Sequence, residues 1–304
     1  MKLRSPARKP PAGAALMLAM WALFLLSAMV ISWALDINSS LTMNGNASRV
    51  VEAAAMAASG GEIALHPAVR PGSPLLRGGM SSTQTFEARL TGEGGRLNLN
   101  WVVAGENPAR IDFLRRYLER KGIDLNERDH MIDTLLDWVD PDNLVRLNGA
   151  EDEGDYKPRN TLLTRIDDVK LIRGWGDFVA RPGWDAELTV NSTGPIDLAW
   201  APVDLLVSLP GMTEPLVEQF LTLRRGEDGL DGKEDDPPFM SLEEVRVALG
   251  FTAEQFKQIA ALVGFRDQVM RIISIGRSGN VTRVVQMIVR KSGNVPQLIS
   301  WKEL

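Results

Sequence analysis

Apolar and charged positions are separated most sharply near the N-terminus of the chain. Residues 10–35 contain no charged side chain, and as a helix residues 14–35 would rise roughly 33 Å, enough to cross a hydrocarbon core of about 30 Å. The first acid, Asp36, follows this run, and four basic residues precede it: Lys2, Arg4, Arg8 and Lys9. This asymmetry predicts a single membrane span with the N-terminus in the cytoplasm and the bulk of the chain outside it.

Helix-compatible residues continue from Asp36 to about Leu65, so the membrane helix is expected to extend beyond the bilayer. The segment RVVEAAAMAAS is rich in Ala and places one apolar stripe on the helix, formed by Val50, Val51, Ala54 and Ala58. The preceding segment NGNAS, residues 44–48, is expected to be a weak point because Gly and Asn have low helix propensity.

Alternation of apolar and polar residues predicts strands on either side of a helical middle. It occurs in two runs joined by a Gly-rich turn, Phe86, Ala88 and Leu90 and then Leu97, Leu99 and Trp101. These runs predict a β-hairpin. Residues 268–304 contain SGN twice between β-branched runs, which predicts two turns joining three strands.

The middle of the chain, from about residue 107 to 265, has a helical pattern and an internal similarity. DDVKLIRGW (167–175) resembles EEVRVALGF (243–251), and IDFLRRYLERKG (111–122) corresponds to VDLLVSLPGMTE (203–214). A duplication of two modules follows. We therefore expect an α+β fold in which an N-terminal helix packs on an antiparallel sheet, with a large duplicated all-helical insertion between the strands.

Composition argues against catalysis and against nucleic acid. The formal net charge is −5 and there is no Cys, so a basic footprint, a disulfide, a thiol nucleophile and Cys-ligated zinc are not expected. The two histidines, His66 and His130, form no metal-binding motif and supply little general base. We therefore expect no catalytic residue and no enzyme activity.

One motif leaves open the alternative of a periplasmic DNA-binding or DNA-uptake protein. The segment LLVSLPGMTEPLVEQFLTLRR resembles a helix-hairpin-helix, whose Gly turn exposes backbone amides to phosphate in DNA-binding versions. Here Glu214 and Glu218 stand at the start of the second helix and would repel phosphate, whereas Arg224 and Arg225 lie at its far end. A protein-packing hairpin is the favoured interpretation.

Two acidic loops are the candidate ligand sites. The first can supply hard oxygen ligands of the kind that suits Ca²⁺, from Asp137, Asp140, Asp142, Glu151, Asp152 and Asp155. The second contains Glu227, Asp228, Asp231, Glu234, Asp235 and Asp236. Neither spacing is that of an EF-hand, and a solvated acidic face is the alternative. Calcium is the only cofactor expected.

Gly13 separates the basic leader from the apolar run, and this arrangement resembles the leaders that prepilin peptidase removes. In the type IV pilin and type II secretion pseudopilin class, which the segment resembles, the cut follows a Gly, so processing between Gly13 and Ala14 is expected. Most members carry Glu as the fifth mature residue, where this chain has Leu18. That Glu is thought to pair with the N-terminal amine of the subunit ahead, since a carboxylate in lipid is costly unless it is paired. Leu18 therefore fits a filament tip, and it equally fits a protein that is not a pilin at all, such as a plain single-span scaffold.

Several motifs in order along the chain are similar to the general secretion pathway protein K family, the large minor pseudopilin of bacterial type II secretion. They are the Gly13 leader with Leu18, GRLNLN, LLDWVDPDN, NGAEDE, DDVKLIRGW, the Leu-Pro-Gly hairpin and the closing SGN…ISWKEL. The resemblance implies a pilin-type fold with helical modules of the SAM-like or helix-hairpin-helix kind. Some relatives bind calcium and carry a disulfide, which this Cys-free chain cannot form.

The resemblance also implies an organisation and a set of partners. The expected parts are a leader (1–13), a membrane helix (14–35), a pilin-like helix with first strands (36–104), two helical modules (105–197 and 198–266) and C-terminal strands (267–304). The chain is expected at the pseudopilus tip, anchored in the bacterial inner membrane with its bulk in the periplasm. Implied partners are minor pseudopilins of the I and J type, the inner-membrane secretion platform, prepilin peptidase and an exported protein, with no nucleic acid.

Overall fold

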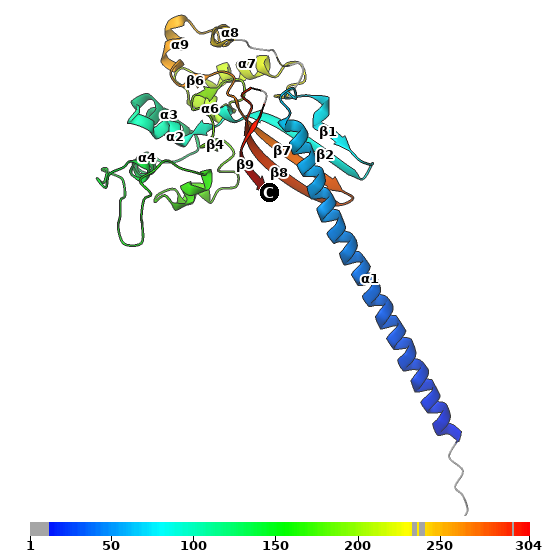
Figure 1. The fold of residues 1–304 in the computed structure, drawn as a ribbon. Helices are drawn as coiled ribbons and strands as arrows, with labels where there is room; N and C mark the ends of the chain where they lie inside the picture. Colours follow the sequence, from blue (N-terminus) through cyan, green and yellow to red (C-terminus); the bar gives the residue numbers. More distant parts are fainter. Residues whose placement is uncertain (1–11, 233–235, 237–240, 294) are drawn as a thin grey trace, which may run out of the picture.

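Figure 1 shows the computed structural model, in which one long helix projects from a head of strands and shorter helices. The structure describes residues 12–232, 236, 241–293 and 295–304, so most of the expected leader lies outside the described residues. Helix α1 spans Ala12–Leu65. Its N-terminal part is free of the head, and its C-terminal part packs along the sheet.

Helix α1 runs without interruption through the segment NGNAS, so the expected weak point is not a break. A single Gly such as Gly45 costs a helix only about 1 kcal/mol, and 54 residues of continuous helix surround it here. Helix propagation is cooperative once a nucleus exists, and the described part of the segment contains no Pro. The helix is therefore one continuous rod rather than two joined pieces.

The sheet is antiparallel and has five strands in the order β1-β2-β7-β8-β9. Their bounds are Arg77–Gly79, Gln84–Gly92, Val269–Ser278, Val281–Arg290 and Gln297–Glu303. The register places Leu90 opposite Ile272 and Ile272 opposite Met287. The three C-terminal strands and the strand over Phe86–Leu90 are therefore confirmed, although strands far apart in sequence, β2 and β7, lie side by side at the centre.

Small residues bring α1 close to the sheet. Ala53, Ala57 and Ala64 are fully buried on its inner face. At Gly276 of β7, an added Cβ would lie 2.1 Å from the carbonyl oxygen of Ala53 and 2.2 Å from the amide nitrogen of Ala57. Gly60 meets β7 in the same way, because its Cβ would lie 2.4 Å from the Ser274 Oγ. Helix and sheet therefore pack closely enough to exclude water from the core between them.

The second half of the expected N-terminal hairpin is wrong. After β2 the chain forms a short 3₁₀ turn, η2 (Glu93–Gly95), and then β3 (Leu97–Asn98), which pairs in parallel with β4 (Leu188–Thr189). Helix α2 (Leu99–Val103) begins directly afterwards, because the Asn98 side chain accepts a hydrogen bond from the Trp101 amide at 3.2 Å. An N-cap of this kind stabilises a helix start, and it ends the strand that alternation predicted.

The insertion between β3 and β7 is mainly helical. Its longer helices are α3 (Pro108–Arg120), α4 (Leu125–Val139), α6 (Val203–Ser208), α7 (Glu214–Arg224), α8 (Leu242–Ala248) and α9 (Ala253–Ile259). Its shorter helical segments are η3 (Ala104–Glu106), η4 (Ile166–Leu171) and α5 (Gly176–Val179). A further 3₁₀ turn, η1 (Pro74–Leu76), precedes the sheet. The insertion is not all-helical as expected, since β3 pairs with β4 and β5 (Ile196–Asp197) pairs with β6 (Val263–Gly264). Two-residue strands are too short to give an alternation pattern.

The two expected modules share one hydrophobic core. Phe113 and Trp175 of the first module and Phe220 of the second belong to the same buried cluster. A separate cluster lies between α1 and the sheet. The matched segments of the internal similarity differ in conformation, because 167–171 lies in the 3₁₀ turn η4 whereas 243–248 lies in the α-helix α8. The duplication stays a prediction.

A buried ion pair joins the sheet to the insertion. Glu93 of η2 is fully buried and accepts two hydrogen bonds from Arg271 of β7, at 2.8 and 2.7 Å. Arg96 approaches the same carboxylate at 3.2 Å, and the Thr189 hydroxyl of β4 donates to it. Three elements therefore meet at one carboxylate, and this contact fixes where the insertion leaves the sheet.

Candidate functional site

Helix α4 ends beside a group of three carboxylates. Asp137 lies in its last turn and is fully buried because α4 turns this face toward the core. Asp140 caps the helix, and Glu151 reaches the same place from the loop that follows. One oxygen from each of the three residues lies within 4.8 Å of the other two. We call these three residues the carboxylate cluster.

Arg146 lies against the carboxylate cluster. Its Nη1 donates to the Asp137 Oδ1 at 2.6 Å and also to the Asp140 Oδ2, and its Nη2 donates to Glu106 at 2.7 Å. The Arg146 backbone amide donates to the other Asp137 oxygen at 3.3 Å. The loop therefore returns to α4 through both the backbone and the side chain of one residue.

Glu151 is the unsatisfied member of the carboxylate cluster. It is 6% exposed, and neither of its carboxylate oxygens has a hydrogen-bond partner in the part of the chain that the structure describes. The Asp140 Oδ1 is also buried without a hydrogen-bond partner among the described residues. Burial raises the pKa of Glu151, and the nearby charges of Asp137 and Asp140 raise it further. A cation would relieve this arrangement, so the residues present fit a hard metal ion such as Ca²⁺.

The other three residues expected at this site do not join the cluster. Asp142 accepts a hydrogen bond from the Leu144 amide at 2.9 Å and so stabilises its own turn. Asp152 and Asp155 are exposed. The structure thus brings together Asp137, Asp140 and Glu151. Sequence reasoning missed Arg146, although a single base within an otherwise acidic loop could have drawn attention to it.

The second acidic loop folds back onto the C-terminal end of α7, the helix that it follows. Asp231 binds the buried Arg224 through two hydrogen bonds, at 2.8 and 2.9 Å, and also contacts Arg225. Arg224 in turn donates to two backbone carbonyls of the preceding loop, those of Leu198 and Ala201. Glu234 and Asp235 lie outside the described residues. Through Asp231, the described part of this loop therefore stabilises the contact between the end of α7 and the segment before α6.

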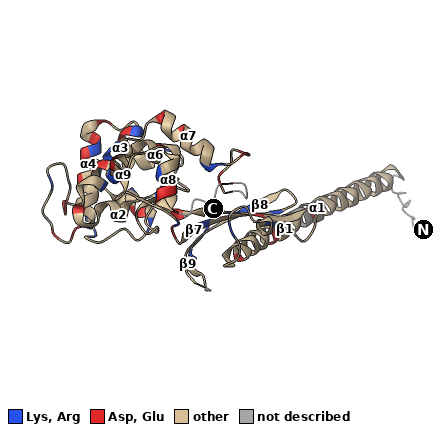
Figure 2. Ribbon diagram, turned by 90° about the horizontal axis from the view of Figure 1, so that it is seen from above, with Lys and Arg blue, Asp and Glu red and all other residues tan. Residues whose placement is uncertain are grey.

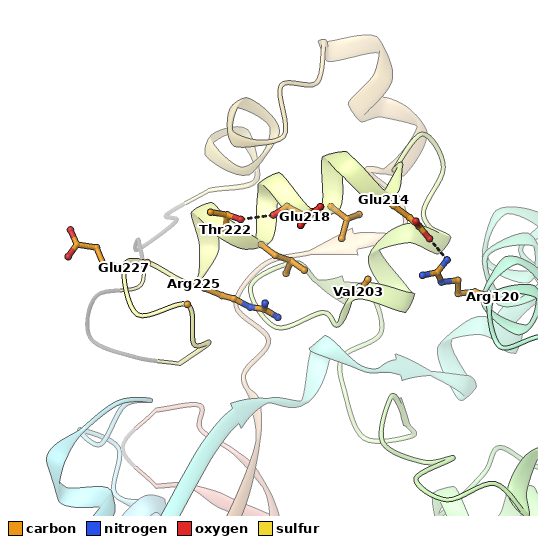
Figure 3. Close-up of a pocket in the computed structure, with 11 residues that line it drawn as sticks. Arg120, Val203, Glu214, Glu218, Thr222, Arg225 and Glu227 are labelled. Carbon is orange, nitrogen blue, oxygen red and sulfur yellow. Dashed lines mark hydrogen bonds and ion pairs between the residues drawn. The ribbon is translucent and has the colours of Figure 1, made fainter.

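The expected helix-hairpin-helix is present as α6 and α7, with Gly211 in the turn at φ +76°. A groove of about 590 Å³ runs along α7, as Figure 3 shows. Arg120 of α3 reaches Glu214 at the start of α7, and Glu218 follows one turn later along the groove. Acidic side chains thus stand where a phosphate would have to approach the helix N-terminus, which disfavours DNA binding.

Charged residues are unevenly distributed along the molecule. Figure 2 shows many of them on the helical insertion, whereas the free segment Ala15–Ile37 of α1 carries only one, Asp36. Residues Ala15–Ile37 form one helical segment long and apolar enough to cross a membrane, and it packs against nothing else in the described chain. Gly13 and Leu18 are both exposed at its start. Cleavage between Gly13 and Ala14 stays a prediction.

Comparison with known proteins adds two findings. Residues 95–180 match the family model described as type II secretion system (T2SS), protein K. The fold is similar to a chain of the crystal structure of the GspK–GspI–GspJ complex from the enterotoxigenic Escherichia coli type 2 secretion system, with a TM-score of 0.60 and 12% identity, over 88% of this chain and 99% of that one. No curated protein matched the sequence. The matched residues 95–180 include the whole carboxylate cluster and Arg146.

Proposed function

We propose that the chain is a member of the type II secretion system protein K family and that it caps the tip of the pseudopilus as a minor pseudopilin. The observation that carries the proposal is the family match, which begins just before the helical insertion and covers its first part. The free apolar helix that projects from the head agrees with it. The apolar helix can pack in a filament core, replacing lipid contacts by helix–helix contacts. The insertion broadens the head beyond the sheet (Figure 1) and would obstruct a subunit placed above it.

We propose that residues 14–35 anchor the chain in the bacterial inner membrane, with the head in the periplasm. The apolar segment Ala15–Ile37 and the basic residues before it support this orientation. In the same proposal, prepilin peptidase cuts after Gly13, and Leu18 replaces a Glu that a tip subunit could not pair.

Processing is tested by co-expressing the full chain with a prepilin peptidase and determining the N-terminal residue of the membrane-bound product. We expect a start at Ala14 that depends on the peptidase and is lost in Gly13→Asp. An intact Met1 in the presence of active peptidase, or a cut beyond Leu35, would contradict the tip-subunit proposal and favour a single-span scaffold or a secreted binding protein.

We propose minor pseudopilins of the I and J type as the immediate partners, with the inner-membrane platform and an exported protein as further ones. The similar chain of known structure comes from a GspK–GspI–GspJ complex, which supports this set. Co-purification of the tagged full chain with co-expressed minor pseudopilins of the I and J type should give one stable complex. In this role the chain is a structural protein without catalytic activity.

We also propose that the carboxylate cluster binds Ca²⁺. The ligands would come from Asp137, Asp140 and Glu151, and the ion would supply the positive charge that the unpaired Glu151 and Asp140 oxygens require. Isothermal titration of the full chain in detergent should show one Ca²⁺ site that Glu151→Gln weakens at least tenfold. Glu153→Gln is the matched control, because Glu153 lies outside the cluster and pairs with Arg173 on the surface.

DNA binding is the less favoured alternative. Its test is a shift assay with duplex DNA at several salt concentrations, because binding through phosphates weakens steeply with salt. The acidic start of α7 predicts no shift at any salt concentration. A salt-dependent shift that Arg225→Ala removes would restore this alternative.

A further inference from the structure

Arg146 divides the oxygens of the carboxylate cluster into two sets. It holds one oxygen of Asp137 and one of Asp140 through the same nitrogen, Nη1. The oxygens left over are the Asp140 Oδ1 and both oxygens of Glu151, which are buried and have no partner among the described residues. The oxygens that lack a partner are therefore different atoms from those that Arg146 binds.

Such an arrangement is unfavourable without a nearby positive charge. Three carboxylates this close repel one another, and their repulsion is strong where water is excluded. Asp137 is fully buried and Glu151 nearly so, whereas the side chain of Arg146 is 22% exposed and its guanidinium also binds Glu106. One guanidinium thus faces four carboxylates, the three of the cluster and Glu106, and leaves an excess of negative charge that a divalent ion would reduce.

The backbone around Arg146 is shaped for the same contact. At Gly149 an added Cβ would lie 1.8 Å from the Asp137 Oδ2, so only glycine lets the loop approach this closely. The Gly149 amide donates to the Arg146 carbonyl oxygen at 3.0 Å, which closes the turn between Arg146 and Glu151. The turn that brings Arg146 to Asp137 therefore also brings Glu151 to the cluster.

We propose that Arg146 is a positioning residue of the calcium site: it holds Asp137 and Asp140 side by side and leaves the unpaired oxygens for the ion. This inference rests on the proposal that the cluster binds Ca²⁺. Arg146 would act as an outer partner that orients the ligands of the ion. Loss of such a partner typically weakens metal affinity by about 10–100-fold. The opposite role, a cation that competes with Ca²⁺ for the same carboxylates, predicts that its removal strengthens binding.

Arg146→Lys separates the two roles, because it keeps the positive charge and removes the planar fork. We expect this variant in the full chain in detergent to bind Ca²⁺ about 10–100-fold more weakly than the wild type. Arg116→Lys is the matched control, since Arg116 pairs with Asp112 on the exposed face of α3 and lies outside the cluster. Equal or tighter Ca²⁺ binding by Arg146→Lys would overturn the inference and leave the calcium proposal intact.

Terbium luminescence distinguishes positioning from a general loss of folding. Trp138 adjoins Asp137 in α4 and can sensitise Tb³⁺ bound at the cluster. Comparing lifetimes in H₂O and D₂O counts the bound waters, and we expect at least one more in Arg146→Lys because a misplaced carboxylate is replaced by water. An unchanged water count with unchanged affinity would refute the positioning role, and failure of the wild type to bind either ion would refute the calcium proposal as well.

Discussion

Gly276 determines how closely α1 approaches the sheet. A Cβ at this position would lie 2.1 and 2.2 Å from two backbone atoms of α1, so no rotamer change can relieve the contact. We expect Gly276→Ala to lower the free energy of unfolding by about 1–3 kcal/mol, because the helix must move away from β7. Urea unfolding of the full chain in detergent, followed by tryptophan fluorescence, measures the change.

Gly176→Ala is the control for that substitution. Apart from its chain neighbours and the backbone of its own helix, no atom of the described residues lies within 4 Å of its added Cβ, so its effect should stay within about 0.5 kcal/mol. A similar loss in both variants would show that the close approach at Gly276 is not the cause.

At the scale of single residues, the sequence predicted the chemistry of the acidic loop better than its geometry. Six acids were candidate ligands, and the fold brings Asp137, Asp140 and Glu151 together while leaving the others in turns or at the surface. Which acids meet depends on the C-terminus of α4 and on the turn at Gly149. Neither feature has a sequence pattern of period two or 3.6, so only the folded loop shows which of the six acids meet.

Among the contacts between elements, the buried Glu93 carboxylate should matter most. Glu93→Gln keeps the shape of the side chain but leaves Arg271 buried without a counter-charge. Breaking one partner of a buried pair typically costs about 3–5 kcal/mol, and we expect a loss of this order in the free energy of unfolding. The matched control is Glu87→Gln, whose exposed pairs with Arg77 and Arg277 contribute at most about 1 kcal/mol. Equal losses would mean that the buried pair stabilises the fold no more than the exposed pairs do.

Asp204 of α6 ties the second module to α3 of the first and gives a pH-dependent contribution. Burial alone would raise the pKa of Asp204, but hydrogen bonds from Lys121 and Arg120 outweigh it and hold the pKa below its ordinary value of 3.8. A lowered pKa in the folded state stabilises the fold above pH 3.8 and loses this effect as the pH falls through the folded pKa.

Asp204→Asn should therefore lower the free energy of unfolding by about 0.5–1 kcal/mol at pH 7, a value reduced by solvent screening. We expect the difference from the wild type to shrink as the pH falls from about 5 to 3. Urea unfolding at pH 7, 5 and 3.5 measures it, with Glu254→Gln as the control, because the pair of Glu254 with Lys257 is largely exposed. A difference that stays constant with pH would contradict the ionic origin.

At the scale of elements, long periodic segments were predictable and short ones were not. The β-branched runs around Gly279 predicted β7 and β8 because ten residues of alternation leave little ambiguity. The alternation over Leu97–Trp101 was misleading, since the Asn98 cap begins a helix after two residues of strand. The parallel pair β5–β6 joins segments about 65 residues apart, which no local pattern can reveal.

The whole molecule combines a projecting apolar helix with a head that the helical insertion broadens beyond the sheet (Figure 1). Charge follows the same division, because charged residues are frequent on the insertion (Figure 2), whereas the free segment Ala15–Ile37 of α1 carries only Asp36. The sequence predicted this division, since it needs only the apolar run and the strands on either side of the helical middle. The sequence did not predict that the insertion has a single hydrophobic core, because that core depends on contacts between residues of both modules.

A tip position requires the head to occur only at one end of each pseudopilus. The chain has no Cys, so Leu147→Cys places a unique thiol on the insertion at a side chain that is 97% exposed. With maleimide-coupled gold we expect label at a single end of isolated pseudopili, and none with the wild-type chain. Label along the shaft would show that the insertion fits between stacked subunits, which would contradict a tip position even if the peptidase cuts after Gly13.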